Sequence, residues 1–105
     1  MSMRHEGYAG AQRAEDHANR VEPLWGRIAY VRALEAISSW GPRTEFTAVQ
    51  LRRAIEERLT PPPDPRAYGN ITRRLVKRGV IRDTGKRLRE GSHGREVVVW
   101  EMRHP

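Results

Sequence analysis

The chain contains no cysteine and no long apolar run. The absence of cysteine excludes disulfides, thiol catalysis and any cysteine-ligated zinc or iron–sulfur site. No apolar stretch approaches the ~20 residues that a membrane span requires, and the N-terminus has no apolar segment of the signal-peptide kind. We therefore expect a soluble, cytoplasmic protein without a membrane partner.

The histidines and carboxylates lack the spacing of a catalytic or metal site. No two histidines stand four residues apart with a carboxylate nearby, and no glycine-rich phosphate loop follows an expected strand. The segment 91–94, Gly-Ser-His-Gly, also lacks the strand-to-helix setting of a nucleophile elbow. The sequence therefore predicts a non-enzyme with no catalytic residue, no metal ion and no cofactor.

Acidic residues are scarce in the second part of the chain. The formal net charge is +7 over 105 residues. Residues 1–60 hold 9 Lys and Arg against 8 Asp and Glu, whereas residues 61–105 hold 11 against 5, so the second part carries +6 of the +7. A local positive excess of this kind favours a nucleic-acid partner.

The first 21 residues show little apolar periodicity. Gly7 and Gly10 indicate a flexible lead-in, and residues 11–20 are compatible with a helix that has almost no hydrophobic face. The alternatives are an extension of the next helix, a separate arm and disorder. We therefore expect a flexible or partly helical arm at 1–21, followed by a single folded domain at 22–103.

A helix is expected over residues 22–39, ended by Trp40-Gly41-Pro42. Its apolar residues recur at helical spacing and form one stripe: Leu24, Ile28, Tyr30, Val31, Leu34 and Ile37. The short segment 45–47 follows, and it can pair with the edge of a hairpin elsewhere.

Thr47 and Gln50 have the spacing of a capping box, which predicts a second helix ending near Leu59. Its expected core face is Ala48, Leu51, Ile55 and Leu59. After the stiff turn at 61–63, Asp64 and Pro65 predict the start of a third helix, over 65–78, with Gly79 as its C-terminal cap. The core face expected for this helix is Ala67, Tyr68, Ile71 and Leu75.

Two segments after Gly79 have strand character, at 80–82 and at 96–102, the second rich in β-branched residues. They predict a β-hairpin with a long basic tip over 85–95. The expected fold class is α+β, mainly helical with a small hairpin.

From Gln50 to Ile81 the sequence resembles the second and third helices of winged helix-turn-helix DNA-binding domains. The segment 75–81, Leu-Val-Lys-Arg-Gly-Val-Ile, is similar to the end of their recognition helix and the entry into the wing. The ending at 92–100 also resembles small phage and prophage proteins of this class. The resemblance covers residues 24–102 and implies the order helix, strand, helix, helix, strand, wing, strand.

The third helix and the hairpin tip supply the expected DNA-binding residues. On the helix, Arg66, Asn70, Arg73 and Lys77 fall within about 60° opposite the core face, where they have the chemistry to contact base edges in the major groove. Arg74 and Arg78 flank this stripe and suit phosphates. The tip adds Lys86, Arg87, Arg89, His93 and Arg95, opposed only by Glu90.

Solvation alone also explains basic residues on an exposed helix or loop. For His93 the alternatives are a neutral donor, a cation at lower pH and no role. The three tryptophans are expected in core or rim packing, with base stacking as the alternative.

The first hypothesis is a duplex-DNA-binding protein, either a small transcription regulator or a phage replication or recombination accessory. The alternatives are a winged-helix module that binds a protein partner and a wing that binds RNA by its shape. A palindromic DNA site would imply a homodimer, with the N-terminal helices as its contact.

Overall fold

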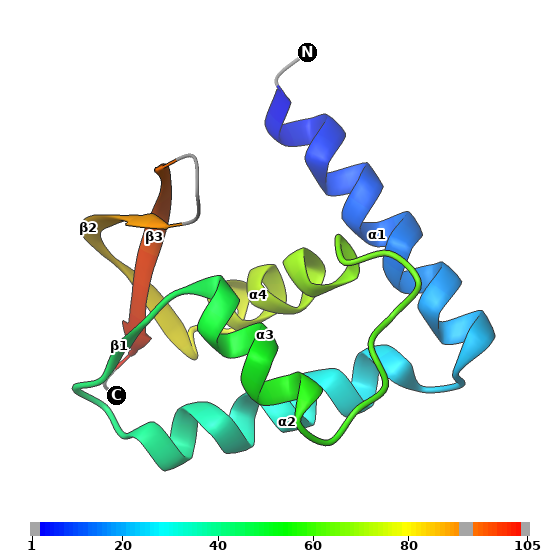
Figure 1. Cartoon of the computed structure of the whole chain (residues 1–105), viewed down its shortest axis with the longest axis horizontal. Helices are drawn as coiled ribbons and strands as arrows, with labels where there is room; N and C mark the ends of the chain where they lie inside the picture. The colour runs from blue at the N-terminus through cyan, green and yellow to red at the C-terminus, as the bar shows by residue number, and fades with distance from the viewer. Residues whose placement is uncertain (1–2, 91–93, 104–105) are drawn as a thin grey trace.

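The computed structural model describes the backbone of residues 3–90 and 94–103, with side chains from residue 9 onward in those ranges (Figure 1). The fold is mixed α+β, with the helices and the hairpin in separate parts of the chain. Its elements are α1 (Met3–Val21), α2 (Trp25–Trp40), β1 (Glu45–Phe46), α3 (Ala48–Glu56), α4 (Ala67–Lys77), β2 (Ile81–Glu90) and β3 (Arg95–Met102).

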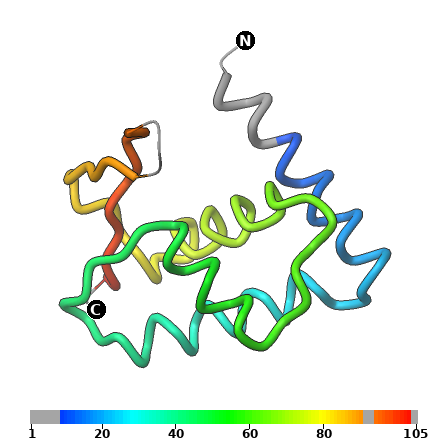
Figure 2. The backbone as a smooth tube through the Cα atoms, viewed as in Figure 1, coloured from blue at the N-terminus to red at the C-terminus, as the bar shows by residue number. Residues whose placement is uncertain are grey.

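The three strands form one antiparallel sheet in the order β1-β3-β2. Glu45 pairs with Glu101 and Phe46 with Trp100, so the expectation that the short segment 45–47 joins the hairpin is confirmed. The hairpin stands at one side of the helices, and α1 lies at the other, with α4 between them (Figure 2).

Trp25 lies at the centre of the core and is only 1% exposed. Its indole packs edge-on against Tyr68 of α4, with ring centroids 5.5 Å apart. The indole N–H donates to the Thr60 carbonyl at 3.2 Å, which fixes the loop between α3 and α4. Tyr68 is buried as well, and this burial is the main cause that raises the pKa of its hydroxyl.

The stripe expected on α2 is wrong in part. Leu24 lies before the helix, at a left-handed φ of 67°, and is 61% exposed, while Val31 is 46% exposed. The buried face repeats every fourth residue, and it keeps Ile37 of the expected stripe: Trp25, Ala29, Ala33 and Ile37. The two alanines in its middle allow the neighbouring helices to approach closely, and the apolar stripe alone does not identify them.

The segment 1–21 forms a helix of its own in its described part. Glu22, Pro23 and Leu24 separate α1 from α2, so α1 is not an extension of the next helix. Its alanines Ala11, Ala14 and Ala18 are at most 5% exposed, and they bury α1 against the rest of the domain.

The signals at the ends of α3 and α4 are local, and most are confirmed. The Thr47 hydroxyl accepts from the Gln50 backbone N–H, and the Gln50 side chain accepts from the Thr47 backbone N–H, which completes the capping box. Gly79 takes φ 72° directly after α4, where its N–H donates to Val76 and the Val80 N–H donates to Leu75. This pair of bonds is a Schellman C-cap.

The core face of α4 is confirmed, whereas two residues of the predicted α3 face do not lie on a buried helix face. The helix α3 ends at Glu56 and not near Leu59, so Leu59 lies beyond the helix, where it is still partly buried against the core. Ala48 is exposed, because it is the first residue of α3 and lies beyond the packed part of the helix. The helix α4 begins at Ala67, two residues after the expected start. Asp64 still caps the preceding turn, since its carboxylate accepts from the Arg66 backbone N–H at 2.9 Å.

The long basic tip expected at 85–95 is wrong in its extent. β2 continues to Glu90, and its ladder with β3 resumes at Arg87 after an irregularity between Asp83 and Arg87 that contains Gly85 at φ 84°. A β-bulge of this kind lets a strand pass through a glycine, so the glycine does not mark a turn. Lys86, Arg87 and Arg89 therefore lie on a strand, and the expected tip residue His93 lies outside the described residues.

Two helical glycines give opposite expectations for substitution by alanine. Gly26→Ala should lower the free energy of unfolding by about 1–3 kcal/mol, because the new Cβ would collide with the Glu15 carboxylate. Gly69→Ala is the matched control: its Cβ would meet only Ala11, at 3.9 Å, so the usual helix gain of about 0.5–1 kcal/mol should remain. Urea denaturation of both variants measures the difference, and a stabilised Gly26→Ala protein would contradict this packing.

Candidate nucleic-acid interface

The helix α4 lies in a stretch of the chain whose charged residues are all positive. Between Asp64 and Asp83, residues 65–82 hold six Lys and Arg and no carboxylate. Ala67, Ile71 and Leu75 are fully buried, which turns the opposite side of α4 outward. A molecule that binds this side of α4 therefore contacts several cations within three helical turns.

A basic groove of about 440 Å³ runs between α1 and α4. Four of its six described lining residues are cations, two are amides and none is a carboxylate: Gln12, Asn70, Arg73, Arg74, Lys77 and Arg78. Guanidinium and amide groups in one concave surface suit phosphate oxygens, which accept several hydrogen bonds at once. We call this surface the α1–α4 groove.

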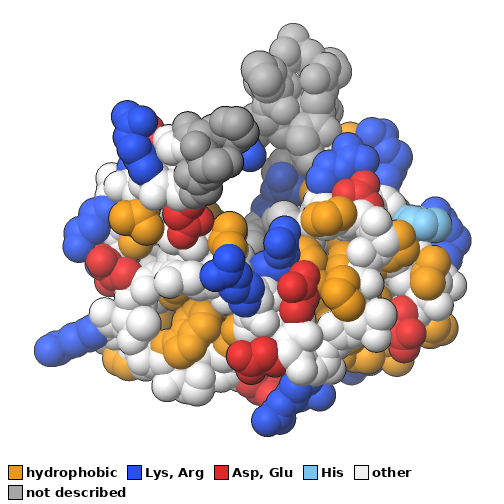
Figure 3. All heavy atoms as spheres, in the orientation of Figure 1, with side chains coloured by type: hydrophobic (Ala, Val, Ile, Leu, Met, Phe, Trp, Pro, Cys, Tyr) orange, Lys and Arg blue, Asp and Glu red, His pale blue; other side chains and the backbone are white. Residues whose placement is uncertain are grey.

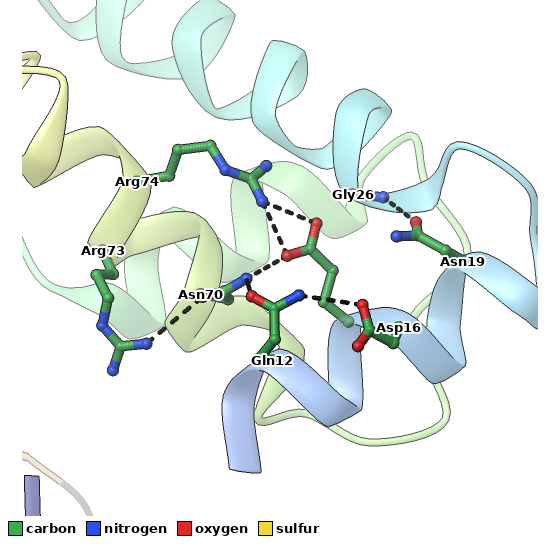
Figure 4. A network of polar contacts seen from close by, with 8 residues as sticks. Gln12, Asp16, Asn19, Gly26, Asn70, Arg73 and Arg74 are labelled. Atoms are coloured by element: carbon green, nitrogen blue, oxygen red, sulfur yellow. Dashed lines mark hydrogen bonds and ion pairs between the residues drawn. The ribbon is translucent and has the colours of Figure 1, made fainter. Parts of the chain in front are cut away.

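The floor of the α1–α4 groove is held by a buried carboxylate. Glu15 of α1 is 4% exposed, and its two oxygens accept from the Arg74 guanidinium at 2.9 and 3.1 Å. Figure 4 labels Arg74, Asn70 and Gln12, which lie around this carboxylate. The Asn70 amide also donates to Glu15, and it donates to Gln12 at 3.2 Å. Glu15 thus orders one cation and one amide of the groove by direct contact.

The prediction that Asn70 lies on an exposed face is wrong. Asn70 is 7% exposed, and its amide hydrogens point at α1. The cause is the second helix: α1 covers this side of α4, and a wheel drawn for α4 alone contains no information on what packs against it. Asn70 supports the groove from within and is not free to contact a base edge.

Arg66 is exposed, as expected, and engaged by a neighbour. Its guanidinium donates to the Asp64 carboxylate at 2.7 and 3.0 Å. The hydrogen bonds from the Arg66 side chain and then from its backbone N–H hold the pKa of Asp64 below its usual value. Arg66 therefore stands immediately before α4 and forms an exposed ion pair with Asp64.

The cations of the last two turns of α4 lie close together. Lys77 is exposed, Arg73 is half-buried and donates to the side-chain amide oxygen of Asn70 at 3.4 Å, and Arg74 pairs with Glu15. The guanidinium of Arg78 lies 4.7 Å from the centre of the Tyr30 ring, and that of Arg74 lies 5.8 Å from it. Tyr30 thus orients two arginines through cation–π contacts.

Most cations expected on the wing are paired or lie on strand β2. Lys86 donates to Glu45 at 2.7 Å and Arg87 donates to Asp83 at 3.0 Å, contacts that raise the pKa of Lys86 and lower that of Asp83. Arg89 donates to the Gly94 carbonyl at 3.5 Å, and Arg95 is exposed at the start of β3. The structure does not bring these four cations into the α1–α4 groove.

Three residues of this site carry no clear signal in the sequence. Gln12 and Glu15 stand in a segment with little apolar periodicity, and Tyr30 stands among residues expected in the core. The alanines at 11, 14 and 18 are a signal for Glu15, because their spacing places Glu15 on the same face of a helix. No such signal marks Gln12 or Tyr30.

The front of the molecule carries cations mixed with carboxylates and apolar side chains (Figure 3). A second, more apolar groove lies between the hairpin and the helices α3 and α4; its lining includes Val49, Thr72, Val97, Val98 and Trp100. Within the described ranges no cluster of His, Asp and Glu is suited to a metal ion, and no helix is long and apolar enough to cross a bilayer.

The Glu15–Arg74 pair should be energetically coupled, unlike an exposed pair. We expect Glu15→Gln to lower the free energy of unfolding by about 1–3 kcal/mol, because Arg74 and Asn70 lose a buried anionic acceptor. A double-mutant cycle with Arg74→Gln measures the coupling. The matched control is the Arg32–Glu35 pair, which is more exposed and should couple by less than about 0.5 kcal/mol. Equal coupling in the two cycles would contradict a structural role for Glu15.

Comparisons of the chain with models of known protein families, with curated proteins and with solved structures find no match. A function for the α4 surface therefore depends on the chemistry of its own residues.

Proposed function

We propose that the chain is a winged helix-turn-helix domain that binds duplex DNA through α4 and the β2–β3 hairpin. The order of elements from α2 onward supports the fold assignment, since a short strand precedes two successive helices and a hairpin. The sheet order β1-β3-β2 supports it too, because the short strand pairs with the far strand of the hairpin. In this proposal α1 is an addition before the domain.

The observation that carries the DNA-binding proposal is the α1–α4 groove. Four cations line it, and the carboxylate of Glu15 beneath them pairs with Arg74. A duplex presents a phosphate about every 1.7 Å along its axis, so it is the ligand that best neutralises such a cluster. Arg73 and Lys77 are the residues that we expect to contact it most directly.

The paired cations of the hairpin are compatible with the same ligand. Lys86, Arg87 and their carboxylate partners are largely exposed, and such ion pairs contribute only about 0–1 kcal/mol each. Exchange of a carboxylate for a phosphate therefore costs little. Arg89 and Arg95 have no carboxylate partner among the described residues, and they extend the positive charge along the hairpin.

A protein partner is the second candidate, and the apolar groove beside the hairpin favours it. This groove is larger than the α1–α4 groove, about 840 Å³, and it presents Val49, Val97, Val98 and Trp100. Apolar, concave surfaces of this kind commonly take side chains of another protein. A partner that remains bound after nuclease treatment would favour this candidate over DNA.

Substitutions inside the α1–α4 groove should reduce DNA affinity more than substitutions outside it. We expect micromolar binding of a random-sequence duplex at 50 mM salt, weakening steeply by 200 mM, in fluorescence anisotropy. Lys77→Gln and Arg73→Gln should each reduce the salt slope by about 1 and the affinity several-fold. The control is Arg58→Gln, which removes the same charge at a different groove, between α2 and α3.

Two results would count against the proposal. Equal losses in Lys77→Gln and Arg58→Gln would mean that only net charge matters, and no binding at 50 mM salt would favour the protein partner. Competition by duplex RNA of the same length separates DNA from RNA, since A-form RNA presents a different groove shape.

A further inference from the structure

We infer that this protein holds DNA by its backbone phosphates and not by its base edges, with α1 as part of the contact surface. The inference rests on the proposed function and specifies its binding mode. It depends on which α4 side chains are available and on where α1 lies.

Residues 67–72, which form the N-terminal half of α4, present almost no side chain that can contact a base edge. Helix-turn-helix proteins use the N-terminal residues of the recognition helix for such contacts. Here Gly69 has no side chain, Asn70 is buried against α1, and the Thr72 hydroxyl donates to the Tyr68 carbonyl at 3.3 Å. Arg66, the residue immediately before α4, has a long polar side chain, and it pairs with Asp64.

The helix α1 also occupies space beside this N-terminal half of α4. Gly10 is buried, and a Cβ at its position would lie 3.2 Å from the Arg66 guanidinium. Ala11 packs against α4 near Gly69, at 3.9 Å from where a Gly69 Cβ would stand. A helix with its side chains is about 10–12 Å across and the major groove is about 12 Å wide, so the groove admits one helix and not two side by side.

The groups left for DNA lie away from the N-terminal half of α4, the part that reaches base edges in helix-turn-helix proteins, so we assign them to phosphates. Arg73 and Lys77 stand in the second half of α4, Arg78 follows it, and Gln12 completes the α1–α4 groove from the α1 side. Guanidinium and ammonium groups bind phosphate oxygens without regard to base sequence. The partner is therefore the phosphate backbone of a duplex. On α1, Gln12 is the residue that we expect to contact a phosphate.

The competing explanation is that Lys77 and Arg78 only stabilise the end of α4. Cations in the last turn of a helix interact favourably with its dipole. In that case their substitution changes thermal stability and leaves DNA affinity unaltered. The two explanations differ in their readouts, so the following measurements separate them.

Sequence selectivity tests the binding mode. Dissociation constants are measured at one salt concentration for three duplexes of equal length: G·C-rich, A·T-rich and mixed. We expect them to agree within about threefold, whereas base-reading proteins prefer their sites by about 10³-fold or more. A selection from a randomised duplex library that yields a motif bound about 100-fold more tightly would overturn the inference and leave the proposed function intact. Absence of binding to every duplex would overturn the proposed function itself.

A charge placed on α1 tests its part in the surface. Gln12→Glu and Arg13→Gln each lower the net charge by one, at neighbouring exposed positions, and only Gln12 lines the α1–α4 groove. We expect Gln12→Glu to weaken binding of the mixed duplex about tenfold and Arg13→Gln by less than about twofold. Urea denaturation confirms that both variants fold. Equal affinities of the two variants would exclude α1 from the interface.

Discussion

The buried carboxylate of Glu15 is the interaction on which the α4 surface depends. A carboxylate removed from water is costly unless it is paired and hydrogen-bonded, so Glu15 requires Arg74 and the Asn70 amide. These contacts fix α1 on α4, and they decide which α4 side chains face outward. The room for the carboxylate comes from Gly26 of α2, where any Cβ would collide with it. Three helices thus meet at one side chain.

The parts of the fold that the sequence predicts are those whose causes are local. The capping box at Thr47 and the C-cap at Gly79 depend on a few neighbouring residues, and both are confirmed. The buried face of α4 is also predicted, because Ile71 and Leu75 stand at helical spacing in an otherwise polar segment. The hairpin follows from the run of β-branched residues after residue 96.

The parts that the sequence does not predict depend on contacts between distant elements. Small residues carry the buried faces of α1 and α2, and alanines give no hydrophobic stripe that separates a core helix from a solvated one. The burial of Asn70 depends in the same way on α1. Its hydrogen-bond partner there, Gln12, lies 58 residues earlier in the chain. The extent of β2 was hidden because Gly85 marks a bulge and not the end of a strand. In the candidate site, the cations are evident from composition, whereas Glu15 is evident only from the fold.

The placement of the cations distinguishes α4 from the rest of the basic surface. In the sheet, Arg82, Lys86 and Arg87 each meet a carboxylate of this chain. On α4, by contrast, Arg73 and Lys77 stand four residues apart, as do Arg74 and Arg78, and like charges at this spacing destabilise a helix by a few tenths of a kcal/mol per pair. Pairing Arg74 with Glu15 relieves only part of this repulsion. The helix dipole favours the cations of the last turn, Arg74 and Lys77, but gives Arg73 no such benefit. A polyanion bound across the α1–α4 groove would convert the repulsion into binding free energy. The charge pattern of α4 therefore supports the proposed contact with a DNA backbone.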